Sequence, residues 1–198
     1  MHWKPSGSPP PAPVKIVIAG GFGVGKTTAV GAISEIAPLR TDSAMTSMAA
    51  TVDSRAGVPD KTTTTVALDF GCITIDETLR LYLFGTPGQD RFGFMWDDIA
   101  VGALGALVIV DTRRMADSYP AVDYFEHIGL PYVVGINLFH GMVAPDPGQV
   151  RWALTIADDV PVIAFDARDR YSVRDALVVV LRHTRARAVN GARRAAPG

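Results

Sequence analysis

A glycine-rich stretch near the start of the chain most constrains what it can fold into. The stretch fits the pattern G-x-x-x-x-G-K-[ST] and consists of Gly20, Gly21, Phe22, Gly23, Val24, Gly25, Lys26, Thr27 and Thr28. An apolar run over 14–19 precedes it, and a helix-like run over 29–36 follows it. Strand, glycine-rich loop and helix in this order predict a phosphate-binding loop, because glycines let successive N–H groups point at one anion. The helix that begins there adds the positive end of its dipole.

Two side chains of this stretch have chemistry suited to a nucleotide. Lys26 is expected to reach the β- and γ-phosphates, and the Thr27 hydroxyl to ligate Mg²⁺. The alternative is a glycine-rich turn with a chance Lys-Thr pair, which the complete match and the correct flanks disfavour. The sequence therefore predicts a nucleotide-binding site.

Chain length and net charge narrow the classes of protein to which the chain can belong. A chain of 198 residues suits one domain, which we expect over 14–188, between a flexible arm over 1–13 and a flexible tail over 189–198. The net charge of −1 argues against a general nucleic-acid or membrane-surface binder. The single cysteine, Cys72, cannot form an internal disulfide, and no run reaches the roughly 18 apolar residues of a membrane span. These features favour a soluble, cytoplasmic protein.

Strand-like and helix-like segments alternate along the chain. Strands are expected over 14–19, 66–75, 79–84, 103–110, 131–136 and 161–165, and helices over 25–37, 116–128, 149–156 and 172–188. The turn at 76–78 makes one hairpin, and 39–63 is predicted as a long loop, a feature that is usually functional. The alternation predicts an α/β fold with a six-stranded, mostly parallel sheet, one antiparallel strand and helices on both faces. Ligands of such sheets bind beyond the carboxyl ends of the strands.

Further motifs follow the predicted strands at this edge. They are Gly85-Thr86-Pro87-Gly88-Gln89, Asp111, Asn137-Leu138-Phe139-His140 and Asp166-Ala167-Arg168. With these motifs the chain resembles the Ras-like small GTPases over about 14–188. It is most similar to their bacterial MglA-like branch, and within that to the ATP/GTP-binding proteins of actinobacterial conservon operons. The resemblance implies a P-loop NTPase fold of the Ras-like three-layer type, with Mg²⁺ and GTP or GDP as ligands.

The resemblance also implies roles for the switch segments. Thr65, with Thr64 as the alternative, resembles the threonine that joins Thr27 in binding Mg²⁺. Gly88 resembles the glycine whose N–H contacts the γ-phosphate, and Gln89 the glutamine that orients the attacking water, so that Gln89 and Lys26 are the expected catalytic residues. The other interpretations are that the threonines only favour a strand edge and that Gln89 only opens a helix.

The chain departs from the family pattern at the residues expected to bind Mg²⁺. Gly85 stands where the family has the aspartate that helps to hold the Mg²⁺ shell. Metal binding then relies on Thr27, Thr65 and phosphate oxygens, or on another carboxylate. Asp111 is a candidate, and an ion pair of Asp111 with Arg113 or Arg114 is the alternative. We expect slow intrinsic hydrolysis from this substitution.

The base-reading motifs are degenerate. Asn137 is retained, but Leu138 and His140 replace the lysine and the aspartate, and an imidazole cannot make the two-bond contact with guanine. By resemblance the Ala167 N–H contacts the base, and Asp166 either contacts the purine or pairs with Arg168. We therefore expect a relaxed preference for guanine, with ATP and ADP also possible ligands.

The sequence thus favours a slowly hydrolysing GTP-binding switch. An ATPase of the same fold and a non-hydrolysing nucleotide-binding scaffold are the alternatives. The resemblance implies a small roadblock-type regulatory protein and a sensor-kinase complex as partners, and a cytoplasmic location with recruitment to the membrane by those partners.

Overall fold

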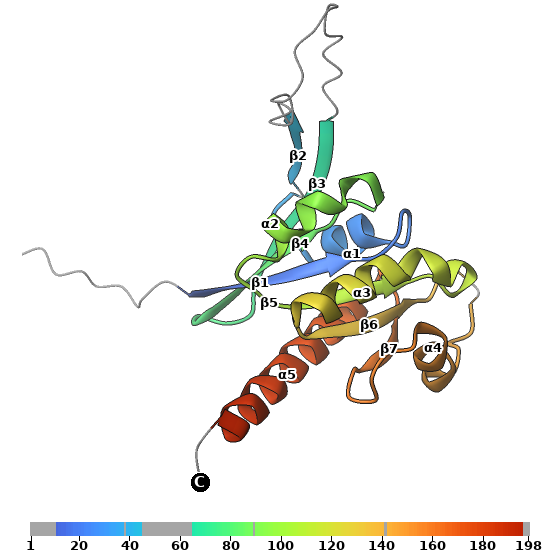
Figure 1. Cartoon of the computed structure of the whole chain (residues 1–198). Coiled ribbons are helices and arrows are strands. Elements are labelled where there is room, and N and C mark those ends of the chain that lie inside the picture. Colours follow the sequence, from blue (N-terminus) through green and yellow to red (C-terminus); the bar gives the residue numbers. More distant parts are fainter. Residues whose placement is uncertain (1–10, 38, 45–64, 89, 141, 196–198) are drawn as a thin grey trace, which may run out of the picture.

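One mixed sheet forms the centre of the computed structural model, which describes residues 11–37, 39–44, 65–88, 90–140 and 142–195. Within these ranges the strand order is β2-β3-β4-β1-β5-β6-β7 (Figure 1). The strands are β1 (Ala12–Ala19), β2 (Leu39–Ala44), β3 (Thr65–Thr74), β4 (Leu79–Gly85), β5 (Ala103–Val110), β6 (Tyr132–Asn137) and β7 (Val162–Phe165). Neighbouring strands pair in parallel except around β3, which runs antiparallel to β2 and β4.

Helices cover both faces of this sheet (Figure 1). They are α1 (Lys26–Ile33), α2 (Trp96–Ala100), α3 (Tyr119–Ile128), α4 (Pro147–Leu154) and α5 (Arg170–Ala195), with the 3₁₀ helices η1 (Asp90–Met95) and η2 (Thr112–Ser118). Side-chain alternation along the strands separates two cores. Ile16 and Ile18 of β1 pack toward α1 and α5. Val17 and Ala19 pack toward α2, α3 and α4.

The α/β class, the three layers and the single antiparallel strand are confirmed, but the sheet has a seventh strand. The extra strand, β2, lies in the segment 39–63 that the sequence predicts to be a loop. Its polar residues 40–43 carry no apolar alternation, so no periodic signal marks it. Backbone pairing with β3, from Leu39 opposite Phe70 to Ala44 opposite Thr65, defines the strand instead.

Two helix ends also differ from expectation. Helix α5 continues to Ala195, so most of the segment 189–198 predicted as a flexible tail is helical. From Arg185 to Ala192 this helix is exposed, which leaves no apolar stripe to reveal it, although Ala and Arg are strong helix formers. Helix α1 ends at Ile33 rather than near residue 37, because Ser34 has an extended backbone (φ −60°, ψ 138°).

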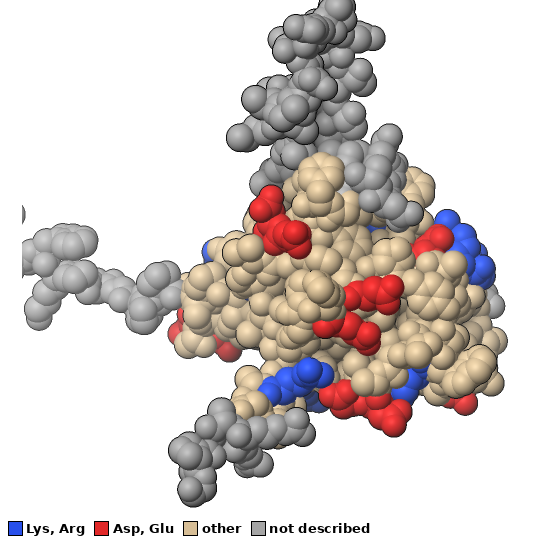
Figure 2. Space-filling model, viewed as in Figure 1, with Lys and Arg blue, Asp and Glu red and all other residues tan. Residues whose placement is uncertain are grey.

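The carboxyl ends of β1, β5, β6 and β7 meet at one edge of the sheet, as parallel pairing requires. The loops that leave this edge carry the motifs singled out in the sequence. Figure 2 shows acidic and basic side chains in small separate clusters on the face viewed, consistent with the near-zero net charge. Within the described ranges, no helix has both the length and the apolar character to cross a bilayer.

The contact between α5 and β5 generates a stability prediction. A Cβ at Gly105 would lie 2.6 Å from the Thr184 Oγ1 and 3.0 Å from the Pro131 carbonyl oxygen. We expect Gly105→Ala to lower the free energy of unfolding by about 1–3 kcal/mol, because overpacking must displace α5. Gly191→Ala on the same helix is the control, since a Cβ there meets nothing within 4 Å. Denaturant unfolding measures both, and equal stability of the two variants would contradict this packing.

Candidate functional site

The loop between β1 and α1 has a backbone that requires glycine. Gly20 has φ 133° and Gly25, the residue that caps α1, has φ 110°. Residues with a Cβ rarely adopt such angles. A Cβ at Gly20 would also overlap the carbonyl oxygen of Ile109 in β5, and one at Gly25 would lie 2.6 Å from the Asn137 Nδ2. The loop can therefore curve tightly between β5 and β6, as the sequence pattern predicts.

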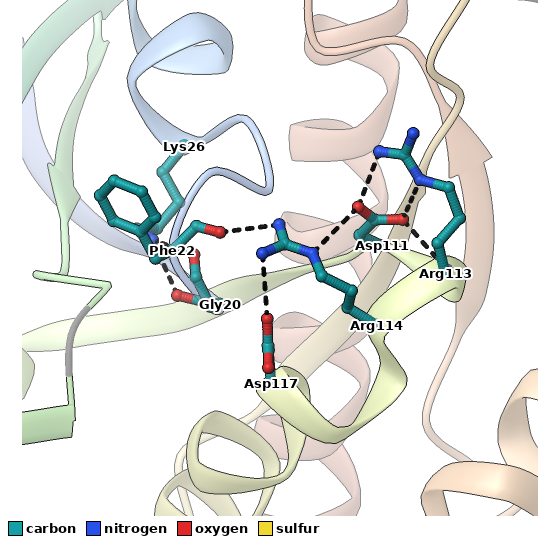
Figure 3. Close-up of polar contacts among 8 residues, drawn as sticks. Gly20, Phe22, Lys26, Asp111, Arg113, Arg114 and Asp117 are labelled. Carbon is teal, nitrogen blue, oxygen red and sulfur yellow. Dashed lines mark hydrogen bonds and ion pairs between the residues drawn. The ribbon is translucent and has the colours of Figure 1, made fainter.

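Lys26 lies inside this curve. Its ammonium donates to the carbonyl oxygens of Gly20 at 2.8 Å and Gly21 at 2.6 Å (Figure 3), and the side chain is buried. Burial lowers the pKa of Lys26 to about 8, while the negative charge of Asp69 acts in the opposite direction. A cation held at the centre of the loop is suited to an anionic ligand.

The segment that follows β4 packs directly against the loop. A Cβ at Gly88 would lie 2.6 Å from the Lys26 Nζ and 2.9 Å from the Phe22 Cα, so only glycine fits there. The structure thus brings Gly88 to Lys26, as the sequence predicts from motifs far apart in the chain. Gln89 lies outside the described residues, and its catalytic role stays a prediction.

Asp69 of β3 is a site residue that sequence reasoning missed. The Thr27 hydroxyl donates to the Asp69 Oδ2 at 2.5 Å. Asp69 is paired with Gly85 of β4, and a Cβ on Gly85 would lie 2.9 Å from the Asp69 Cβ and 3.2 Å from its Oδ2. The Asp69 carboxylate therefore lies beside position 85, where the family has its aspartate. An isolated acid in an otherwise apolar strand was the available signal, but only the strand register shows that it faces Gly85.

The predicted switch threonine is only partly described. The backbone of Thr65 begins β3 and pairs with Ala44 in β2. Figure 1 shows these two strands rising beyond the rest of the sheet. The side chain of Thr65 and all of Thr64 lie outside the described part of the chain, so the assignment of Thr65 to the metal stays a prediction.

Asp111 forms the ion pair that was the alternative to metal binding. Its buried carboxylate lies 2.8 Å from the Arg113 Nη2 and 3.7 Å from the Arg114 Nε. The hydrogen bonds from Arg113 lower the pKa of Asp111, although its burial acts in the opposite direction. Arg113 in turn lies over the Phe139 ring, 4.2 Å from the centroid. Asp111 thus holds the first turn of η2 through its contacts with Arg113 and Arg114.

Arg114 joins η2 to the glycine-rich loop, a contact that sequence reasoning also missed. Its Nη2 donates to the Phe22 carbonyl oxygen at 2.9 Å, and its Nη1 lies 3.4 Å from the Asp117 Oδ2 (Figure 3). A Cβ at Gly21 would lie 2.5 Å from the Asp117 Cβ, so η2 is packed against the loop.

Asn137 connects the loop to the segment after β7. Its Nδ2 donates to the Val24 carbonyl oxygen at 2.9 Å, and its Oδ1 accepts the Ala167 N–H at 3.0 Å. The amide that the resemblance assigns to the base is therefore engaged by Asn137. Leu138 is half-buried beside it and His140 is exposed.

Asp166 pairs with Arg168, one of the two alternatives for this residue. The Arg168 guanidinium donates to the two carboxylate oxygens at 2.8 and 2.6 Å. These hydrogen bonds are the main cause that lowers the pKa of Asp166. The carboxylate is thus held in its charged form by its neighbour in the chain.

The depressed pKa of Lys26 generates a pH prediction. An unfolded chain keeps Lys26 protonated to about pH 10.5, whereas the folded chain releases the proton above about pH 8. The unfolded state therefore binds more protons in this window, and folded-state stability rises with pH. We expect the stability of wild type relative to Lys26→Met to increase by up to roughly 3 kcal/mol between these pH values. Parallel urea titrations at each pH measure the difference in the free energy of unfolding between the two proteins. Contributions from groups that the two proteins share cancel in this difference. A pH-independent difference would contradict the assignment.

Comparisons with known proteins agree with this geometry. Residues 18–181 match the model of a family described as "conserved hypothetical ATP binding protein". An uncharacterized protein of Methanocaldococcus jannaschii is 32% identical over 126 residues, which are 63% of this chain and 69% of that protein.

Two solved structures share the fold. The G domain of the T. maritima FeoB iron transporter has a TM-score of 0.59 at 16% identity, over 87% of this chain and 99% of that one. The FeoB G-domain from Methanococcus jannaschii has a TM-score of 0.56 at 13% identity, over 87% and 98%. The P-loop NTPase fold that the resemblance implies is thus confirmed. The Ras-like family, its MglA-like branch and the similarity to conservon-operon proteins stay predictions. By the match over most of its length, the chain belongs to the family of conserved hypothetical ATP binding proteins and has the P-loop NTPase fold of a G domain.

Proposed function

We propose that the protein is a Mg²⁺-dependent switch that binds a purine nucleoside triphosphate, with GTP as a loosely preferred ligand, and hydrolyses it slowly. The observation that carries the proposal is the convergence of an ammonium, a hydroxyl and a carboxylate on one glycine-rich loop. Lys26 and Thr27 lie at the junction of that loop with α1, and Asp69 reaches Thr27 from β3. They offer a cation for the phosphates and oxygen ligands for a metal.

The phosphates are bound by the loop and by Lys26. Bound phosphate oxygens replace the carbonyls of Gly20 and Gly21 as partners of the ammonium. A nearby anion favours the charged form of Lys26, so binding raises the lowered pKa. The amides at the start of α1 add the positive end of the helix dipole.

The oxygen atoms at Thr27 fit Mg²⁺, which takes few protein ligands and keeps phosphate and water oxygens around it. The Thr27 Oγ1 is the direct ligand in this proposal. The Asp69 carboxylate, already 2.5 Å from that hydroxyl, orients the metal's water shell and offsets its charge. Thr65 is a further ligand in this proposal. Bound Mg²⁺ neutralises charge on the phosphates.

Hydrolysis proceeds by in-line attack of water on the γ-phosphorus with departure of the diphosphate oxygen. Gln89 orients the water, and Lys26 with the Gly88 N–H stabilises charge on the γ-phosphate. The carboxylate supplied by Asp69 from a neighbouring strand supports metal binding. The slow rate that we propose rests on Gly85, because the aspartate of the Ras-like family is absent at this position and Asp69 contacts Thr27 instead.

The switch acts through the segments 39–65 and 85–96, whose contacts with the nucleotide a partner reads. Phe22 in the loop and Phe94 in η1 are 65% and 61% exposed, and such rings suit a protein interface. By resemblance the partner is a small roadblock-type protein within a sensor-kinase complex, which recruits the cytoplasmic switch to the membrane.

An ATP-binding protein of the same fold is the second candidate. The Ala167 N–H is engaged by Asn137 rather than free for guanine, and the family is described as ATP-binding. Leu138 and His140 stand in place of the two side chains that read guanine. A scaffold that binds nucleotide without hydrolysing it uses the same contacts.

Competition binding separates the guanine and adenine candidates. We expect GTP and ATP to displace a fluorescent triphosphate within about tenfold of each other, because His140 replaces the acid that makes the two-bond guanine contact in the Ras-like family. GDP and ADP give the matched diphosphate pair, and each titration is repeated with EDTA. Discrimination above about a thousandfold in favour of GTP would contradict the relaxed preference, and the reverse would establish the ATP-binding candidate.

A carboxylate exchange between β3 and β4 tests the metal site. Asp69→Gly is expected to reduce the Mg²⁺-dependent part of the triphosphate affinity by about 10–100-fold, because the Thr27 ligand loses its carboxylate partner. Adding Gly85→Asp to this variant returns a carboxylate to the same space without the 2.9 Å clash that Gly85→Asp alone creates. We expect the double variant to recover Mg²⁺ dependence, measured as the ratio of affinities with Mg²⁺ and with EDTA. Unchanged Mg²⁺ dependence in Asp69→Gly would exclude Asp69 from the metal shell.

A further inference from the structure

The contact between η2 and the glycine-rich loop assigns a positioning role to Arg114. We infer that Arg114 fixes the Phe22–Gly23 peptide so that the Gly23 N–H faces the bound phosphate. The inference rests on the proposed function and names a further residue of the same site. Arg114 lies outside every motif named in the sequence, and it contacts the loop from η2.

The guanidinium of Arg114 is held from three sides. It donates to the Phe22 carbonyl oxygen at 2.9 Å, and it lies 3.4 Å from the Asp117 carboxylate and 3.7 Å from the Asp111 carboxylate (Figure 3). The backbone of Arg114 leaves helical geometry within η2, at φ −142° and ψ 55°. Asp111 is fully buried, so the anchor of this arrangement is fixed in the core.

Peptide geometry converts this contact into an orientation of the next amide. A trans peptide is planar, with its C=O and N–H pointing in opposite directions, and no peptide in the described residues is cis. Because the Phe22 carbonyl points toward η2 outside the loop, the Gly23 N–H points to the loop's other side. Arg114 therefore selects a donor, rather than a carbonyl oxygen, for the inner face.

This peptide needs an external contact to stay in one orientation. Gly23 has φ 74° and, as a glycine, can adopt both positive and negative φ. A rotated peptide would place the Phe22 carbonyl oxygen against the phosphate, where it repels the anion. A hydrogen bond from a guanidinium is charge-assisted and thus strong enough to select one state.

Arg114 contributes to phosphate binding by positioning the peptide and not by its charge, because the carboxylates of Asp111 and Asp117 offset that charge. Arg113 is the matched comparison within the same helix. It pairs with the same Asp111 but lies over Phe139 instead of contacting the loop. Arg113→Gln and Arg114→Gln therefore each remove one positive charge beside Asp111. Only the second also removes the loop contact and the ion pair with Asp117.

Two measurements on the full chain test the inference. The first is the affinity for inorganic tripolyphosphate without metal, at about 0.05 M and about 0.5 M salt. We expect Arg114→Gln to bind about tenfold more weakly than wild type at both salt concentrations, and Arg113→Gln to bind within about twofold of it. The second is the Gly23 amide resonance of the ligand-free protein, which should move in Arg114→Gln and stay in Arg113→Gln.

Each outcome decides the role of Arg114. Equal losses in the two variants, a loss that disappears at high salt, or an unmoved Gly23 resonance would overturn it. If wild type binds no tripolyphosphate, the proposed function fails, and the Gly23 resonance still decides whether Arg114 orients the peptide. Thermal unfolding of each variant verifies folding, and Arg114→Lys, which keeps one donor and the charge, serves if the glutamine variant does not fold.

Discussion

The structure depends on an ammonium buried against backbone carbonyls. Lys26 donates to Gly20 and Gly21, no carboxylate of the described residues is in direct contact with it, and burial lowers its pKa to about 8. Burying a cation without such a partner costs folding free energy, and a chain selected for stability alone would place an apolar residue there. The glycine-rich loop and the helix that follows it are arranged around this charge. A buried, weakly compensated cation of this kind is typical of a binding site.

The Asp69 carboxylate lies beside Thr27, although position 85, where the Ras-like family has its acid, is glycine. Asp69 and Gly85 are opposite each other on antiparallel strands, and only one of the two positions has room for a side chain. The acid of this pair lies on β3, where its carboxylate accepts a hydrogen bond from the Thr27 hydroxyl, and position 85 is glycine. The absence of the acid at position 85 therefore does not remove the carboxylate from the site.

The sequence predicted the parts of the structure that have local signals. The apolar run of β1, the turn before β4 and the glycine pattern of the loop each depend on neighbours in the chain, and all three are present. The contacts it missed depend on register or on long-range packing. Asp69 is visible as a site residue only when β3 is placed against β4, and Arg114 only when η2 is placed against Phe22. Strand β2 escaped prediction because its polar residues pair through the backbone.

The central claim is that the loop around Lys26 binds the phosphates of a purine nucleoside triphosphate. Calorimetric titration of the full chain with Mg²⁺-GTP and with Mg²⁺-ATP tests it most directly, with Lys26→Ala as the comparison. We predict saturable binding of at least one nucleotide by wild type, and a loss of about a hundredfold or more in the variant, because a charge-assisted contact to the phosphates is removed. Binding of neither nucleotide by folded wild type, or equal binding by Lys26→Ala, would contradict the claim.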